Sequence, residues 1–214
     1  MPSKPSTPRP PARPTWFESI VDDASGGVAD DDVCFGSNVV HGPLHLDGGD
    51  TQELRFTAGV PFETPITHHY GGPLPAISVA LRAVAAIPSA ADANVTVPLV
   101  VAATPAQDAV LEAVGRLGFP LLGTSVRAGS DLGGLTPAIQ QIRFGGSPQF
   151  PGADLLSLSL QPGFDVTNAY VVIGSEGALT SPRSRPGHLR VDHNRIHGVD
   201  SARELHHLIS GLSR

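Results

Sequence analysis

The stretch that decides the fold is DLLSLSLQPGFDVTNAYVVIG, residues 154–174. Leucines alternate with small polar residues from Leu156 to Gln161, which is the two-residue period of a strand with one buried face. The segment Ala169–Gly174 holds an aromatic residue and several β-branched ones, as strands favour. Only Pro162–Asn168 separates the two segments, so we expect them to pair antiparallel.

The rest of the chain also favours short strands over long helices. Gly and Pro account for 24 and 21 of the 214 residues, and both interrupt regular structure. Pro98 predicts an edge position for its segment, because proline has no N–H to donate to a neighbouring strand. We predict an all-β sandwich or barrel of about eight strands. Besides the two segments above, the expected strands are Val33–Val40, Glu53–Thr57, Ile77–Ile87, Val95–Ala103, Pro120–Arg127 and Ala138–Phe144.

Short helices are predicted between these strands. The segment Ala106–Leu117 follows Thr104, a good N-cap residue, and a proline that suits the first helical position. Gly118 is expected to end this helix. Ser201–Leu212 has its apolar residues on one face and predicts an amphipathic helix. The apolar cluster Trp16–Val21 favours another short helix.

An α/β layered domain is the competing fold. Residues 95–103, 106–117 and 120–127 have the strand, helix, strand order of a right-handed βαβ unit. However, Thr104–Pro105 stands where such folds carry a glycine-rich phosphate loop. No helix is predicted between the strands near the C-terminus, so we keep the all-β prediction.

Charge is unevenly distributed along the chain, whose formal net charge is −6. Residues 1–15 carry +3 and six prolines with almost no apolar side chain, which predicts a disordered, extended arm. Residues 16–63 carry −9, and residues 182–214 carry +3. A polyanion is therefore expected to meet the two ends of the chain and not its body.

Composition also bears on the compartment. The one cysteine, Cys34, allows no intramolecular disulfide and is predicted to be a small core residue. No apolar run approaches the roughly 18 residues of a membrane helix. The N-terminus shows no signal peptide pattern. We expect a reducing, cytoplasmic setting without a membrane partner.

The nine histidines predict no metal site. Two pairs are four residues apart, but glycine, proline or asparagine beside them does not suit a ligand-bearing helix. Two further pairs are adjacent, so their rings cannot readily chelate one ion. These pairs are His41 with His45, His193 with His197, His68 with His69, and His206 with His207. No nucleophile elbow, phosphate-binding loop or acid–base carboxylate pair is present, so we predict no catalytic residue, no cofactor and no enzymatic activity.

Three strings resemble the coat proteins of small plant RNA viruses, most closely the tymovirus-like group of tymoviruses and marafiviruses. They are HHYGGPLPAISVALRAVA (68–85), ANVTVPLVVAATPAQDAV (93–110) and ADLLSLSLQPGFDVTNAYVVIGSEGALTSP (153–182). The third is similar to the closing pair of strands of that family's shell domain. The likeness is one of pattern, and it spans about residues 50–182.

This resemblance implies an eight-stranded jelly-roll sandwich over residues 16–182, between a Pro-rich arm (1–15) and a basic extension with a terminal helix (183–214). It implies a capsid protein that assembles with itself into an icosahedral shell around single-stranded RNA. Such a protein would be part of a virion assembled in the host cytoplasm. Its RNA contacts would be weak and non-specific, and we expect them from Lys4, Arg9, Arg13, Arg183, Arg185 and Arg190.

Two other functions remain open from the residues. One is a small soluble α/β or β-sandwich protein of bacterial origin with an unassigned ligand, which includes a metal bound through histidine. The other is a partner-binding module whose proline-rich segment PSTPRPP, ending at Pro11, docks in an aromatic groove.

Overall fold

The structure is a computed structural model that describes residues 15–23, 33–87, 90–128, 138–174, 186–198 and 200–212. Two antiparallel sheets make up most of it. The first sheet has the strand order β2-β1-β5-β6, with strands β1 (Thr15–Asp23), β2 (Val33–His41), β5 (Ile77–Ala85) and β6 (Ala93–Leu99). The second has the order β11-β10-β9-β8-β7, with strands β7 (Leu121–Ala128), β8 (Ala138–Gly145), β9 (Leu155–Pro162), β10 (Val166–Gly174) and β11 (Gly187–Asp192).

The smaller elements complete the fold. A hairpin pairs β3 (His68–His69) with β4 (Gly72–Pro73). Helix α1 (Pro105–Arg116) follows β6, and the 3-10 helix η1 (His193–Gly198) and helix α3 (Ser201–Leu212) follow β11.

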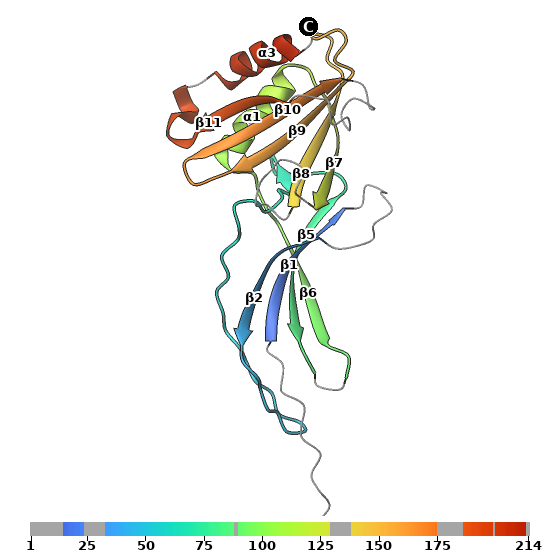
Figure 1. Cartoon of the computed structure of the whole chain (residues 1–214), viewed down its shortest axis with the longest axis vertical. Coiled ribbons are helices and arrows are strands. Elements are labelled where there is room, and N and C mark those ends of the chain that lie inside the picture. The colour runs from blue at the N-terminus through green and yellow to red at the C-terminus, as the bar shows by residue number, and fades with distance from the viewer. Residues whose placement is uncertain are drawn as a thin grey trace, which may run out of the picture.

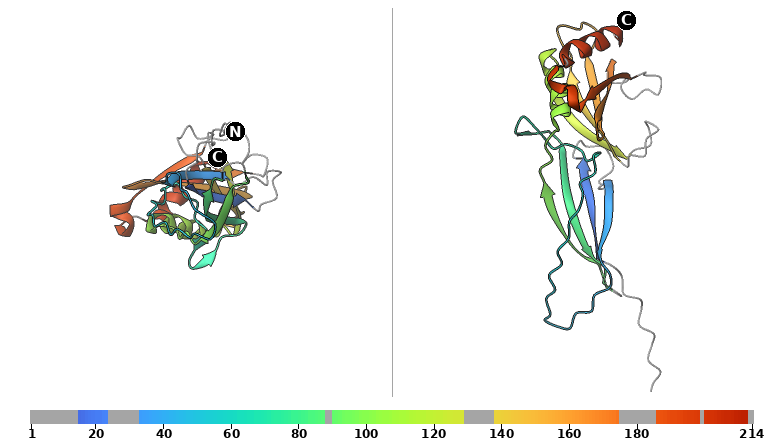
Figure 2. Two further views of the ribbon diagram at one scale, coloured as in Figure 1. Left: turned by 90° about the horizontal axis from the view of Figure 1, so that it is seen from below. Right: turned by 90° about the vertical axis from the view of Figure 1, so that its left-hand side faces the viewer.

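The two sheets lie end to end along the long axis of the molecule (Figure 1). The first sheet and the long connection between β2 and β3 form the lower lobe. The second sheet forms the upper lobe, and both helices lie on one side of it (Figure 2). A small apolar cluster that contains Val79 of β5 and Val126 of β7 lies where the two sheets meet.

Local chemistry explains why α1 begins and ends where it does. The Thr104 hydroxyl accepts a hydrogen bond from the Gln107 backbone N–H at 3.4 Å, and the Gln107 side chain accepts one from the Thr104 N–H at 2.8 Å. This reciprocal pair is a capping box, which satisfies two N–H groups that a helix start leaves unpaired. After the helix, Gly118 adopts φ +80°, a conformation that glycine takes without strain.

The main core lies between the helices and the inner face of the upper sheet. Val110 and Val114 of α1 are fully buried against sheet residues such as Leu156, Leu158 and Val171. Leu205 and Ile209 of α3 belong to the same cluster. The helix thus holds its position through its apolar face, which leaves its outer side free to carry polar groups.

Much of the sequence interpretation is confirmed. The fold is β-rich, and the segments at 154–161 and 169–174 pair antiparallel as β9 and β10. Helix α1 lies within one residue of its expected ends, and α3 spans Ser201–Leu212 as expected. Pro98 lies in β6, which is an edge strand.

Three local predictions are wrong. The cluster Trp16–Val21 is not helical but lies in β1, whose backbone pairs with both β2 and β5. Hydrogen bonding on both sides outweighs the weak helical spacing of its apolar residues. The segment Glu53–Thr57 forms no strand, and Cys34 is exposed on β2 and not in the core.

The eight-stranded jelly-roll sandwich is not confirmed. The described sheets lie end to end and do not face each other as two layers (Figure 1). The α/β alternative is wrong as well, because β6 and β7 belong to different sheets and α1 therefore joins no parallel pair. Within the expected C-terminal extension, residues 187–198 form β11 and η1 and residues 201–212 form α3, and β11 pairs with β10.

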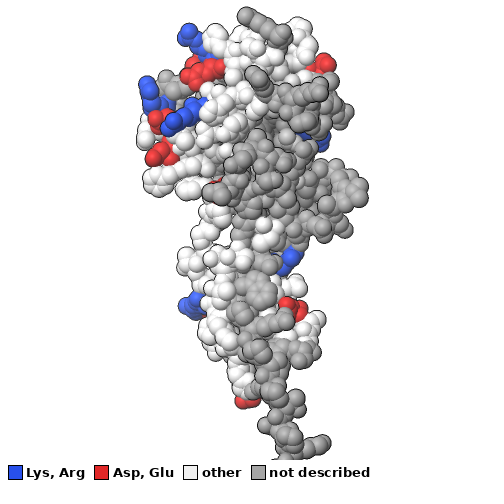
Figure 3. Space-filling model, in the orientation of Figure 1, with Lys and Arg blue, Asp and Glu red and all other residues white. Residues whose placement is uncertain are grey.

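Charged side chains of both signs are interspersed on the face of the molecule in Figure 3. The described part of the lower lobe on this face is mostly uncharged. None of the described helices is long and apolar enough to cross a membrane.

Candidate functional site

A groove of about 420 Å³ lies between the β3–β4 hairpin, helix α1 and the β7–β8 pair. Its walls are mostly apolar. Polar side chains from the hairpin and the helix stand at its rim. The lining residues are His69, Tyr70, Leu74, Leu111, Glu112, Gly115, Arg116, Phe119, Leu121 and Phe144.

The hairpin turns through two residues, Tyr70 and Gly71, that both have positive φ, 49° and 72°. Strand register places His69 opposite Gly72 across this turn. Two successive positive φ angles are typical of a tight type I′ turn, which glycine accepts and a bulky aromatic residue does not favour. Tyr70 adopts this conformation at the tip of the hairpin, where its side chain is 68% exposed. Strained exposed residues of this kind are found at functional sites more often than elsewhere.

The hairpin is anchored to the upper lobe by partly buried polar contacts. The Gln140 side chain of β8 accepts a hydrogen bond from the Ile66 N–H at 2.9 Å and donates one to the Ile66 carbonyl at 2.7 Å. Next along the chain, the Thr67 N–H donates to the Val101 carbonyl at 2.8 Å. The segment that leads into β3 is therefore hydrogen-bonded to β8 through Gln140 and to Val101, just before α1.

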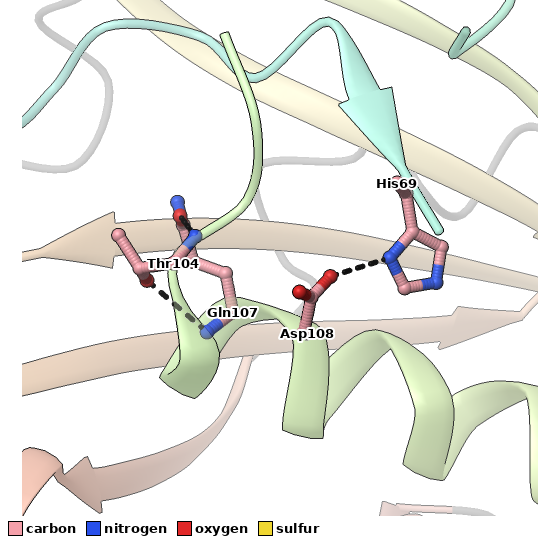
Figure 4. A network of polar contacts seen from close by, with 4 residues as sticks. All are labelled: His69, Thr104, Gln107 and Asp108. Carbon is pink, nitrogen blue, oxygen red and sulfur yellow. Dashed lines mark hydrogen bonds and ion pairs between the residues drawn. The ribbon is translucent and has the colours of Figure 1, made fainter. Parts of the chain in front are cut away.

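His69 contacts Asp108, in the first turn of α1 (Figure 4). Its Nδ1 lies 2.8 Å from the carboxylate Oδ1, and the imidazole is only 17% exposed. Since a carboxylate only accepts hydrogen bonds, we assign the proton to Nδ1. In the neutral ring Nε2 then holds the lone pair and can accept a hydrogen bond or a proton at the rim of the groove.

Tyr70 contacts the same helix one turn further along. Its phenol is hydrogen-bonded to Glu112, and its ring lies 4.3 Å from the His69 ring between centroids. Partial desolvation, followed by this hydrogen bond and the negative charge of Glu112, raises the pKa of Tyr70 above its usual value of 10.0. Glu112 also lies 3.9 Å from Arg116 in an i, i+4 ion pair on the helix surface.

A β-bulge shapes the opposite wall. Leu121 lies opposite Phe144 and Gly123 lies opposite Arg143, so Leu122 is an extra residue in β7. Leu121 and Leu122 are both partly exposed although they are large and apolar. Of these, Leu121 lines the groove together with Tyr70, and Leu122 lies next to it in the bulge.

The amino-acid sequence matches the model of a known protein family. The family model described as SpoOM protein (Spo0M) matches residues 18–172, well over half of the chain. The chain belongs to the Spo0M family. The crystal structure of Spo0M, a sporulation control protein from Bacillus subtilis, superposes with a TM-score of 0.75 at 18% identity, over 94% of this chain and 85% of that one. At this identity the likeness shows the fold alone. No curated protein matches the chain.

Membership of the Spo0M family overturns the viral interpretation. The chain is not a tymovirus-like coat protein. The capsid shell, the packaged RNA and the virion location were predicted from that resemblance, and these predictions are wrong as well. Of the residues expected to bind RNA, the structure describes Arg190 alone. Arg190 lies exposed on β11, and the others lie outside the described residues: Lys4, Arg9, Arg13, Arg183 and Arg185.

The described histidines of the four pairs belong to no cluster of metal-binding side chains. Within the described ranges, no group of three or more His, Cys, Asp or Glu side chains is placed to hold a metal ion. Of the described members of these pairs, only His69 lines the groove.

The sequence interpretation missed the groove. It predicted no hairpin at residues 68–73, whereas Tyr70–Gly71 forms the turn of one. The glycine of the two-residue turn is one part of a hairpin signal, but the flanking pairs His68–His69 and Gly72–Pro73 lack the apolar alternation that completes it. The contact of His69 with Asp108 had no such signal, because 39 residues separate them.

Proposed function

We propose that this Spo0M-family protein acts by binding and not by catalysis, and that the groove beside α1 binds an apolar group of a protein partner. The structurally similar protein from Bacillus subtilis is a sporulation control protein. We extend this to a regulatory role for the present chain. In such a role, the protein would act by binding a partner and not by converting a substrate.

The observation that supports the proposal is the chemistry of the groove. The walls of the groove are apolar, and the exposed side chains of Tyr70 and Leu121 lie beside them. The charged side chains of Glu112 and Arg116 stand at the rim. Protein interfaces have this anatomy, with aromatic anchors at the centre and a polar periphery. The volume also lies within the range of ordinary ligand pockets.

Gly115 provides a direct test, because it lines the groove and a Cβ placed on it would meet nothing within 4 Å. The change Gly115→Leu should fill the groove without disturbing the core. Gly211 is a matched control: it is also the eleventh residue of a 12-residue helix, and its Cβ would also meet nothing within 4 Å. Both changes should stabilise their helices by up to about 1 kcal/mol.

The probe is N-phenyl-1-naphthylamine, a neutral aromatic dye that fluoresces in apolar sites. The parent protein and Gly211→Leu should bind it equally, and Gly115→Leu should bind it at least about tenfold more weakly, which corresponds to about 1.4 kcal/mol. Equal binding by all three proteins would show that the groove is not a binding site.

The regulatory role has its own test. The gene is deleted from a spore-forming organism that carries it, and heat-resistant spores are counted. Restoring the parent gene should restore the count, and restoring the Gly115→Leu variant should not. A spore count that the deletion leaves unchanged refutes a role in sporulation control.

A further inference from the structure

We infer that the group bound in the groove is an apolar side chain next to a cation, as in a partner segment where an aromatic or aliphatic residue adjoins a lysine. This inference rests on the proposed function, because it names the chemistry of the ligand for the same groove. Three features of the rim support it.

The first feature is a line of charge along α1. Asp108, Glu112 and Arg116 are four residues apart, so they lie along one stripe of the helix. With a rise of about 1.5 Å per residue, Arg116 lies roughly 12 Å along the axis from Asp108. That distance exceeds the Debye length of about 8 Å at physiological ionic strength. The end of the groove near the hairpin is therefore negative on balance: the charges of Glu112 and Asp108 both raise the pKa of Tyr70, and the opposing effect of Arg116 is smaller.

The second feature is the pairing of the charges. Arg116 already lies beside Glu112, at 3.9 Å, so part of its charge is balanced within the helix. Asp108 lies next to the groove, with its carboxylate 2.8 Å from Nδ1 of His69. Asp108, Glu112 and Arg116 together carry one negative charge.

The third feature is that acceptors outnumber donors at this end. The carboxylates of Asp108 and Glu112 accept hydrogen bonds, and Nε2 of His69 accepts one when the ring carries a single proton, on Nδ1. An ammonium group has three donors and no acceptor, so it complements these atoms. A carboxylate in the same place would meet like charge and further acceptors.

The size of the groove fits the apolar part of this ligand. A volume of about 420 Å³ accommodates an indole ring with its neighbouring backbone. Leu111, Phe119 and Phe144 supply the apolar contacts for it. The stem of a lysine can lie along the helix while its ammonium stays at the wet rim.

The inference is tested on the full chain, labelled with ¹⁵N, by titration with three dipeptide amides that share one apolar side chain. They are N-acetyl-Trp-Lys-amide, N-acetyl-Trp-Gln-amide and N-acetyl-Trp-Glu-amide. The lysine peptide should bind most tightly and the glutamate peptide least, with roughly a fivefold to tenfold difference between these two in low salt. Raising the salt concentration should reduce that difference.

The change Glu112→Gln identifies the charge responsible. It should reduce the preference for lysine about threefold, in line with the worth of one exposed charge contact. The control Glu204→Gln removes the same charge from α3, where Glu204 is exposed in the first turn and does not line the groove. It should leave the preference unchanged.

The outcomes separate this inference from the proposed function. If the neutral dye binds in the Gly115-dependent way but the three peptides bind equally, the groove is a binding site and the cation preference is wrong. An equal loss of preference in Glu112→Gln and Glu204→Gln also overturns it, since net charge alone would then explain the data. If Gly115→Leu affects neither the dye nor the peptides, the proposed function itself fails.

Discussion

The paired hydrogen bonds between Gln140 and Ile66 should be the contact that holds the β3–β4 hairpin at the groove. Replacing Gln140 by Met keeps the length of the side chain but removes both its donor and its acceptor. Ile66 is 2% exposed, so its N–H and carbonyl would lose partners in a place where water has little access. The change therefore tests whether this contact fixes the hairpin.

The expected cost follows from the number of groups left unpaired. Each buried polar group without a partner costs about 1–3 kcal/mol, and the change leaves two such groups on Ile66. Apolar burial of the methionine offsets a part of this. We expect the free energy of unfolding to fall by about 2–5 kcal/mol.

Urea unfolding with linear extrapolation measures this change. Gln141→Met is the matched control, because Gln141 is the next residue of β8 and points to the opposite face of the sheet. It should change stability by no more than about 0.5 kcal/mol. A loss below about 1 kcal/mol for Gln140→Met, or equal losses for both variants, would refute the reasoning.

Three further predictions concern the hairpin and the helix packing. Gly187→Ala should cost about 1–3 kcal/mol in a thermal unfolding experiment, because its Cβ would lie 2.9 Å from Leu208 of α3; Gly211→Ala, whose Cβ meets open space, should instead stabilise the protein by up to about 1 kcal/mol. Glu112→Gln should lower the pKa of Tyr70 towards 10.0, measured by NMR titration of the tyrosine ring, since both the hydrogen bond to the carboxylate and its charge favour the neutral phenol; a pKa that stays equally high contradicts the assigned contact. Because that pKa is raised in the folded state, the contribution of Tyr70 to stability is present below pH 10 and decreases as the pH rises beyond it. Tyr70→Gly should relieve the strain of φ 49° but also remove the contacts of the ring with Glu112 and His69, so the free energy of unfolding should change by no more than about 1 kcal/mol while dye binding weakens. A larger loss of stability without a loss of binding would show that the ring only supports the fold.

Structure that depends on neighbouring residues was predictable from the sequence. The start of α1 needs only Thr104, a proline and Gln107 within a few residues, and its end needs Gly118. The strands β9 and β10 alternate or are β-branched over their own length and are joined directly. In such elements local preference and tertiary packing agree, so the local pattern is sufficient.

Structure that depends on distant partners was not predictable in this way. The apolar residues of Trp16–Val21 suit either a short helix or a strand, and β5, which pairs with this segment, begins only at Ile77. The groove has the same origin, because its rim joins His69 to Asp108 across 39 residues. The viral resemblance rested on alternation, prolines and a capped helix, which many β-rich proteins share, and such features carry little information on function.

The polar contacts of the hairpin also explain why a groove exists at all. A hairpin held by apolar side chains would pack down onto Leu111 and Phe119 and close the space, since apolar surfaces approach until their atoms touch. Here His69 and Tyr70 meet the carboxylates of α1 at the helix rim, and hydrogen-bond geometry keeps them there. The contacts that hold the hairpin therefore leave the apolar walls uncovered beneath it, and they also give the opening its negative charge. A ligand that brings both an apolar group and a cation satisfies the two properties together.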